Sequence, residues 1–179
     1  MIDSIGIYKR ANNLVRMCET RDSLKIAKEV GIDVIRVNYF KSLLGMYTYH
    51  LRKRFIIINI EMDDYLTQMV VAHEIGHDYL HRELAKGEAL KEFELFRMQK
   101  NTTEYEANAF AAHILLDTDK FIELAHEGYD VAQIAMQMNT EINLALIKLQ
   151  ELIRLGYDLR MPMDTRGDFL KKIKAERGY

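Results

Sequence analysis

The sequence predicts an α+β fold in which a short antiparallel sheet of three strands packs against a central helix. Three observations lead to this prediction. Apolar residues recur at helical spacing in the first 30 residues, strand-like apolar runs follow between residues 32 and 60, and helical spacing returns from residue 64 onward. Because the chain has 179 residues and is 49% hydrophobic, it can form one compact domain or a small domain with a helical appendage.

The N-terminal part is predicted to contain two helices and then the sheet. The first helix covers about residues 5–18, and the second begins near Asp22 and ends at Gly31, a residue type common just after a helix. Strands rich in β-branched and aromatic residues are expected at residues 32–37, 43–49 and 55–60.

The central helix carries the motif with the most chemical content, His73-Glu74-x-x-His77. We expect this helix to begin after a cap at residues 63–64 and to end near His81. Positions four apart on an α-helix return to within roughly 40° of each other, so both imidazoles can bind one metal ion. Glu74 then lies beside them, where a general base can take a proton from a metal-activated water.

Two further features of this helix bear on the interpretation. Both histidines fall on its apolar stripe, so they should be buried and need partners; a shared Zn²⁺ ion would satisfy both, although satisfied core histidines are an alternative. His81 lies eight residues beyond His73, about 12 Å along the axis, which is too far for both to bind one ion. We therefore expect His81 to support the site rather than to bind the metal.

A third ligand is expected on a later helix, near residues 102–112. Small residues there allow close approach to the central helix. Either Glu104 or Glu106 could supply a carboxylate. Asn108 lies four residues beyond Glu104 on the same face, where it can support a ligand, whereas Glu106 projects about 200° away.

The motif H-E-I-G-H at residues 73–77, followed by E-x-x-A-N-x-F-A at residues 104–111, resembles the ImmA/IrrE family of zinc metallopeptidases, which is encoded by mobile elements, prophages and stress-response loci. The resemblance extends from the N-terminal helices to about residue 121. It implies a minimal zincin-like fold, with a metallopeptidase domain at residues 1–126 and a helical C-terminal subdomain at residues 127–179 packed on it.

The same resemblance implies the roles of the site residues. His73, His77 and Glu104 would be the Zn²⁺ ligands, and Glu74 the general base, with Asn108 and His81 behind the ligands. The implied substrate is a partner protein, usually a helix-turn-helix transcriptional repressor, whose site-specific cleavage derepresses transcription.

Composition excludes several other classes of function. A formal net charge of −2 and a pI near 6.3 provide no global basic field, so direct nucleic-acid binding is not expected. The single cysteine, Cys18, excludes an internal disulfide. No apolar run resembles a signal peptide or a membrane span, so we expect a cytoplasmic protein with no membrane partner.

Two alternative functions remain open from the sequence. The protein could bind or sequester a repressor without cleaving it, in which case Glu74→Gln would leave induction intact. It could instead be a DNA-binding regulator that uses residues 131–155. The second of these is weakened because the last predicted helix offers only Lys148 and Arg154 as cations, against two glutamates.

Overall fold

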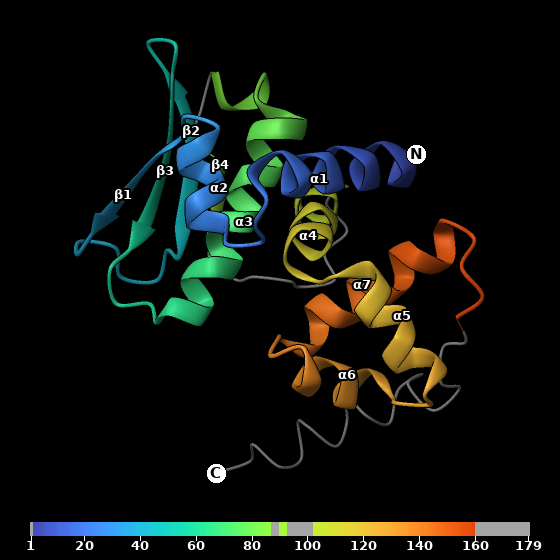
Figure 1. The fold of residues 1–179 in the computed structure, drawn as a ribbon. Helices are drawn as coiled ribbons and strands as arrows, with labels where there is room; N and C mark the ends of the chain where they lie inside the picture. Colours follow the sequence, from blue (N-terminus) through green and yellow to red (C-terminus); the bar gives the residue numbers. More distant parts are fainter. Residues whose placement is uncertain (1, 87–89, 93–101, 160–179) are drawn as a thin grey trace.

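The computed structural model describes residues 2–86, 90–92 and 102–159 and has the predicted α+β class (Figure 1). Its elements, in chain order, are α1 (Ser4–Cys18), α2 (Ser23–Glu29), β1 (Asp33–Val37), β2 (Gly45–His50), β3 (Lys53–Asn59), α3 (Asp64–His81), the 3₁₀ helix η1 (Leu84–Lys86), β4 (Leu90–Glu92), α4 (Thr102–Leu115), α5 (Thr118–His126), α6 (Val131–Gln137) and α7 (Ile142–Arg154). None of the described helices is long and apolar enough to cross a membrane.

Aspartate caps determine where most of these helices begin. In each case the carboxylate accepts a hydrogen bond from a backbone N–H in the first turn, which would otherwise lack a partner. The capping residues are Asp3 for α1, Asp22 for α2, Asp63 for α3, Asp117 for α5 and Asp130 for α6. The predicted start of the central helix, α3, is therefore confirmed.

The sheet differs from the predicted three-stranded antiparallel arrangement in two details. The strand order is β1-β3-β2-β4, and β1 runs parallel to β3, so the sheet is mixed. A fourth strand, β4, pairs antiparallel with the first half of β2. Strand periodicity is the same in parallel and antiparallel pairs, so the sequence could not specify the partner of β1. The three residues of β4 are too few to show a period.

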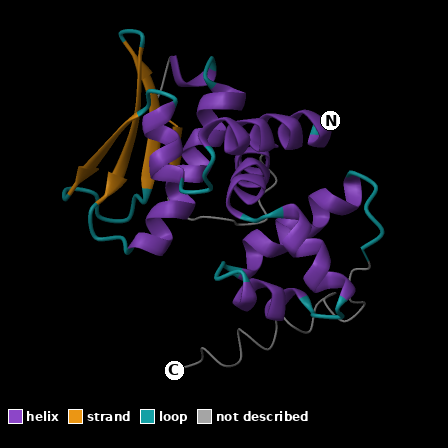
Figure 2. Ribbon diagram, viewed as in Figure 1, coloured by secondary structure: helices purple, strands orange, loops and turns teal. Residues whose placement is uncertain are grey.

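All the helices lie on one side of the sheet, as Figure 2 shows. Tyr47 of β2 and Ile56 and Ile58 of β3 are completely buried on the helical side. Helix α3 packs on these two strands, and α4 packs on α3 and α1. Consequently α3 lies in the interior, between the sheet and α4.

The C-terminal helices form a second apolar cluster next to this core. It contains Phe121 and Leu124 of α5, Val131 and Ile134 of α6, and Leu149 and Leu152 of α7. Other residues of α7, including Leu144 and Ile147, belong to the main core beneath α4. The C-terminal helices are thus packed on the core, while a domain boundary after residue 126 stays a prediction. The final part of that predicted subdomain, residues 160–179, lies outside the described residues.

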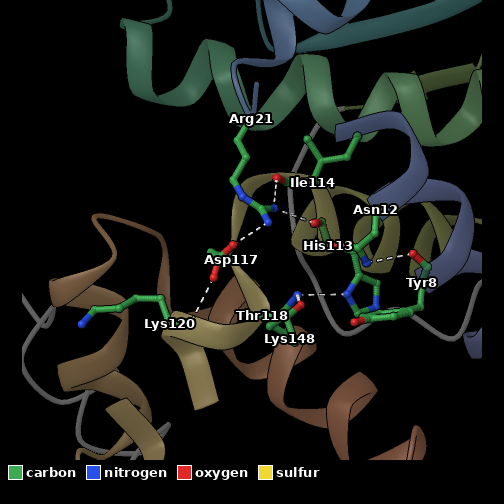
Figure 3. A network of polar contacts seen from close by, with 9 residues as sticks. All are labelled: Tyr8, Asn12, Arg21, His113, Ile114, Asp117, Thr118, Lys120 and Lys148. Carbon is green, nitrogen blue, oxygen red and sulfur yellow. Dashed lines mark hydrogen bonds and ion pairs between the residues drawn. The ribbon is translucent and has the colours of Figure 1, made fainter. Parts of the chain in front are cut away.

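A buried polar network joins the two clusters (Figure 3). The Lys148 ammonium of α7 lies 3.1 Å from Nδ1 of His113 on α4 and donates to Oγ1 of Thr118 at 2.9 Å. Arg21, just before α2, donates to the His113 carbonyl and to the Asp117 carboxylate. Because no part of Lys148 is exposed, burial lowers its pKa from 10.5 to about 7.

Candidate metal centre

The two histidines of the motif point toward the same place in the interior. His73 is 0% exposed and His77 is 2% exposed, one helical turn apart on α3. Their Nε2 atoms are only 3.0 Å apart. The predicted convergence of the two imidazoles is therefore present, and it follows directly from the i, i+4 spacing on one helix.

Gly76 allows α4 to approach this part of α3. A Cβ atom added at Gly76 would lie 3.0 Å from both the Cα and the carbonyl oxygen of Ala107, and 3.2 Å from Cβ of Phe110. Such distances to backbone atoms are shorter than normal van der Waals contact. The absence of a side chain at Gly76 and the small side chain of Ala107 thus permit the close crossing of the two helices.

This crossing brings Glu104, in the first turn of α4, to the histidine pair. Its Oε2 atom lies 3.3 Å from Nε2 of His73 and 3.5 Å from Nε2 of His77. Glu104, which the resemblance implies as the third ligand, is therefore the carboxylate placed against both histidines. Among the described residues, His73, His77 and Glu104 form the group of side chains suited to hold a metal ion.

The donor atoms fit a tetrahedral metal ion. Ligands about 2.0–2.1 Å from a tetrahedral zinc ion are about 3.3–3.4 Å from one another. The three separations in this protein are 3.0, 3.3 and 3.5 Å. Two imidazoles and one carboxylate are also a donor set typical of catalytic zinc, which leaves a fourth position open for water.

The environment favours the protonation states that bind metals. Burial lowers the pKa of His77 to about 4, so its imidazole is neutral at pH 7. Burial by itself raises the pKa of the Glu104 carboxyl, but contacts with His73 and His77 outweigh burial and hold this pKa below its usual range. A neutral imidazole and an ionised carboxylate are the forms that coordinate a metal.

Each histidine has a partner on its second ring nitrogen. Nδ1 of His73 lies 2.7 Å from Oδ1 of Asn108, and Nδ1 of His77 lies 3.1 Å from Nδ1 of His81. Asn108 and His81 therefore lie behind the two histidines, as expected. Nε2 of His81 in turn lies 3.0 Å from Oε2 of Glu106, the carboxylate that projects away from Glu104 on α4. Only the packing of α4 on α3 brings Glu106 to His81.

Glu74 is fully buried beside the start of β2. A Cβ atom added at Gly45 would lie 3.1 Å from Oε1 of Glu74 and 2.5 Å from Cγ1 of Val70. Gly45 therefore leaves the space that the Glu74 carboxylate and Val70 occupy. The sequence analysis missed this role, because the neighbours of a glycine across a helix–sheet contact leave no local pattern.

The buried carboxylate of Asp78, the residue after His77, accepts hydrogen bonds that link the sheet to α3. The hydroxyl of Tyr47 on β2 donates to Oδ1 of Asp78 at 2.5 Å, and Arg54 of β3 donates to Oδ2 at 3.1 Å. Arg82 also contacts both carboxylate oxygens. Since Gly45 and Tyr47 belong to the same strand, these bonds hold the start of β2 against Glu74. Asp78 is a second residue that sequence reasoning missed.

Comparisons with known proteins agree with this geometry. Residues 27–149 match the model of a peptidase family described as the IrrE N-terminal-like domain. A protein of Bacillus phage phi105 called uncharacterized immunity region protein 2 is 31% identical over 147 residues, which cover 82% of this chain and 91% of the phage protein. Metallopeptidase ImmA of Bacillus subtilis strain 168 is 25% identical over 152 residues, which cover 83% of this chain and 87% of that protein.

Proposed function

Because the chain belongs to the ImmA/IrrE family of metallopeptidases, we propose that it is a zinc-dependent endopeptidase that cleaves a partner protein at a specific site. The observation that carries this proposal is the convergence of donor atoms from His73, His77 and Glu104 beside the buried carboxylate of Glu74. Zn²⁺ held by these residues would supply Lewis acidity, which polarises a peptide carbonyl and makes water a stronger nucleophile at neutral pH.

The residues of this chain perform the remaining work. Glu74 accepts a proton from the attacking water and then delivers it to the leaving amine nitrogen, so one carboxylate acts first as base and then as acid. His73 and His77 would hold the ion through Nε2, and the Glu104 carboxylate would contribute negative charge. Asn108 accepts a hydrogen bond from Nδ1–H of His73 and holds that ring in position.

The proposed substrate is a helix-turn-helix transcriptional repressor, and its cleavage would derepress the genes that it controls. The motifs at residues 73–77 and 104–111 support this proposal through their resemblance to a family that acts on such repressors. The name of the phage relative assigns that protein to an immunity region, which is consistent with a regulatory protease of a mobile element.

The surroundings of the two cations on α7 argue against the DNA-binding alternative. Lys148 is fully buried, and Arg154 donates to Glu151 at 2.8 Å and to the hydroxyl of Tyr105. Lys148 therefore cannot reach a DNA phosphate, and the exposed Arg154 is already paired with Glu151, so α7 presents one cation at most to DNA. The other alternative, sequestration of a repressor without cleavage, is separated from the proposal by the following experiment.

The test compares the wild type with Glu74→Gln, Glu104→Ala and a matched control, Glu123→Gln. Glu123 is an exposed residue of α5, and its carboxylate pairs with the exposed Lys120. We expect about one zinc ion per wild-type chain by elemental analysis after dialysis, and loss of that zinc in Glu104→Ala. Glu74→Gln should keep the zinc but cleave the repressor proposed as its substrate about 100- to 10,000-fold more slowly.

The assay is mass spectrometry of the repressor fragments, beside a reporter for induction in cells. Cleavage and induction by Glu74→Gln at the wild-type rate would refute the role of Glu74. Induction by Glu74→Gln without cleavage would instead support the sequestering protein. A broad ladder of casein fragments from the wild type would contradict site-specific cleavage.

A further inference from the structure

A chain of three side chains leads from the metal site toward the protein surface. Nδ1 of His77 contacts Nδ1 of His81 at 3.1 Å, and Nε2 of His81 contacts the Glu106 carboxylate at 3.0 Å. Exposure increases along this chain, from 2% for His77 and 7% for His81 to 21% for the Glu106 side chain. The first two residues come from α3 and the third from α4.

The direction of hydrogen bonding follows from the chemistry of the last member. A carboxylate oxygen accepts hydrogen bonds, so the contact is a hydrogen bond that Nε2–H of His81 donates to Oε2 of Glu106. When Nε2 carries the only proton of the His81 ring, Nδ1 has a lone pair and accepts. The proton between the two histidines must therefore belong to Nδ1 of His77.

This assignment has a consequence at the metal site. A His77 ring that is protonated on Nδ1 presents the lone pair of Nε2, which is the atom 3.5 Å from Oε2 of Glu104. The opposite tautomer would place a proton where the metal ion must bind. It would also set the lone pair of His77 Nδ1 against the lone pair of His81 Nδ1.

We propose that Glu106 acts through His81 as a positioning residue that holds His77 in its metal-binding tautomer and orientation. The proposal rests on the proposed zinc site and extends it. At His73, Nδ1 contacts Oδ1 of Asn108 directly. His77 uses two partners in series, and the second belongs to α4, the helix that also provides Glu104. Docking of α4 on α3 thus supplies one ligand and orients another.

The test measures zinc affinity by competition with a chromophoric chelator. Two variants break the chain, Glu106→Ala and His81→Leu, and two conservative variants preserve its hydrogen bonds, Glu106→Gln and His81→Gln. The glutamine carbonyl replaces the carboxylate acceptor in Glu106→Gln and the Nδ1 acceptor in His81→Gln. We expect the dissociation constant to rise about 10- to 100-fold in the first two variants, while the glutamine variants retain most of the affinity. Glu123→Ala is the control for loss of a surface carboxylate.

Two further readouts separate this role from a merely structural contact. Thermal unfolding of the metal-free proteins reports whether the variants fold, and ¹⁵N spectra of the zinc-loaded wild type should show the His81 proton on Nε2 alone. Unchanged zinc affinity in folded Glu106→Ala and His81→Leu would overturn the proposal, as would a His81 proton on Nδ1. If the wild type binds no zinc, the proposed function fails instead, before any variant is compared.

Discussion

Replacing Lys148 by methionine tests how the C-terminal helices dock on the core. The ammonium group is fully buried between α4, α5 and α7. Burial is the main cause of its lowered pKa, and the charge of Arg21 adds to it, while Asp117 and Asp119 oppose it. Methionine is similar in length and carries no charge, so the variant removes the titrating group with little change in packing.

The sign of the pH dependence follows from the two pKa values. In the unfolded chain the Lys148 pKa is 10.5, whereas in the folded protein it is about 7. Between these values the unfolded state binds more protons, so the free energy of unfolding rises with pH. Integrating from pH 7 to pH 9 yields about 2 kcal/mol of added stability in the wild type, which Lys148→Met should lack.

Urea unfolding of metal-free wild type and Lys148→Met at pH 7, 8 and 9 measures this difference. Loss of the hydrogen bonds to His113 and Thr118 changes the variant's free energy of unfolding by the same amount at each pH, because neither partner titrates in this range. Lys120→Met, at an exposed position, is the control and should show no such slope. A difference between wild type and Lys148→Met that stays constant within about 0.5 kcal/mol would refute the reasoning.

Three other perturbations should have measurable effects. Gly76→Val should separate α3 from α4, which lowers stability by about 1–3 kcal/mol and weakens zinc binding. Calorimetry measures the stability and chelator competition measures the zinc affinity. If neither changes, the close contact at Gly76 does not hold the two helices together. Tyr47→Phe should cost about 1–3 kcal/mol because it removes a hydrogen bond to the buried Asp78 carboxylate, whereas Tyr39→Phe at an exposed position should be neutral in the same melts. For metal-free protein, the His77 pKa of about 4 lies below its unfolded value of 6.5, so stability is lost as pH falls through this window. From pH 6.5 to pH 5, the free energy of unfolding should fall by about 1.5 kcal/mol more in the wild type than in His77→Gln. Equal losses in the two proteins would exclude a lowered His77 pKa.

Local features of the site could be predicted because they depend on one helix or one turn. The i, i+4 spacing of His73 and His77 determines that their rings converge, whatever packs around them. The start of α3 depends on Asp63 and its hydrogen bond to the N–H of Leu66, which lie close in sequence. The α+β class was likewise predictable, since it depends on the order of helical and strand-like periods.

Contacts between elements were not predictable in the same way. The parallel pairing of β1 with β3 leaves each strand's alternation unchanged, so the residues carry no signal of it. Gly45 and Asp78 have their roles only because β2 lies against α3. Gly45 and Asp78 are far apart along the chain, so the sequence alone does not indicate that their elements lie close together.

The sequence by itself determined that α3 is an interior helix with two histidines and a glutamate placed for metal chemistry, because backbone geometry sets the spacing within a helix. The spacing of Glu104 to Asn108 favoured Glu104 as the third ligand, but only the tertiary structure decided that its carboxylate meets the histidines. Glu104 and Glu106 are two residues apart in similar sequence surroundings. The close crossing at Gly76 places Glu104 against His73 and His77, and Glu106 against His81. That choice depends on how two helices pack, which is a property of the whole core.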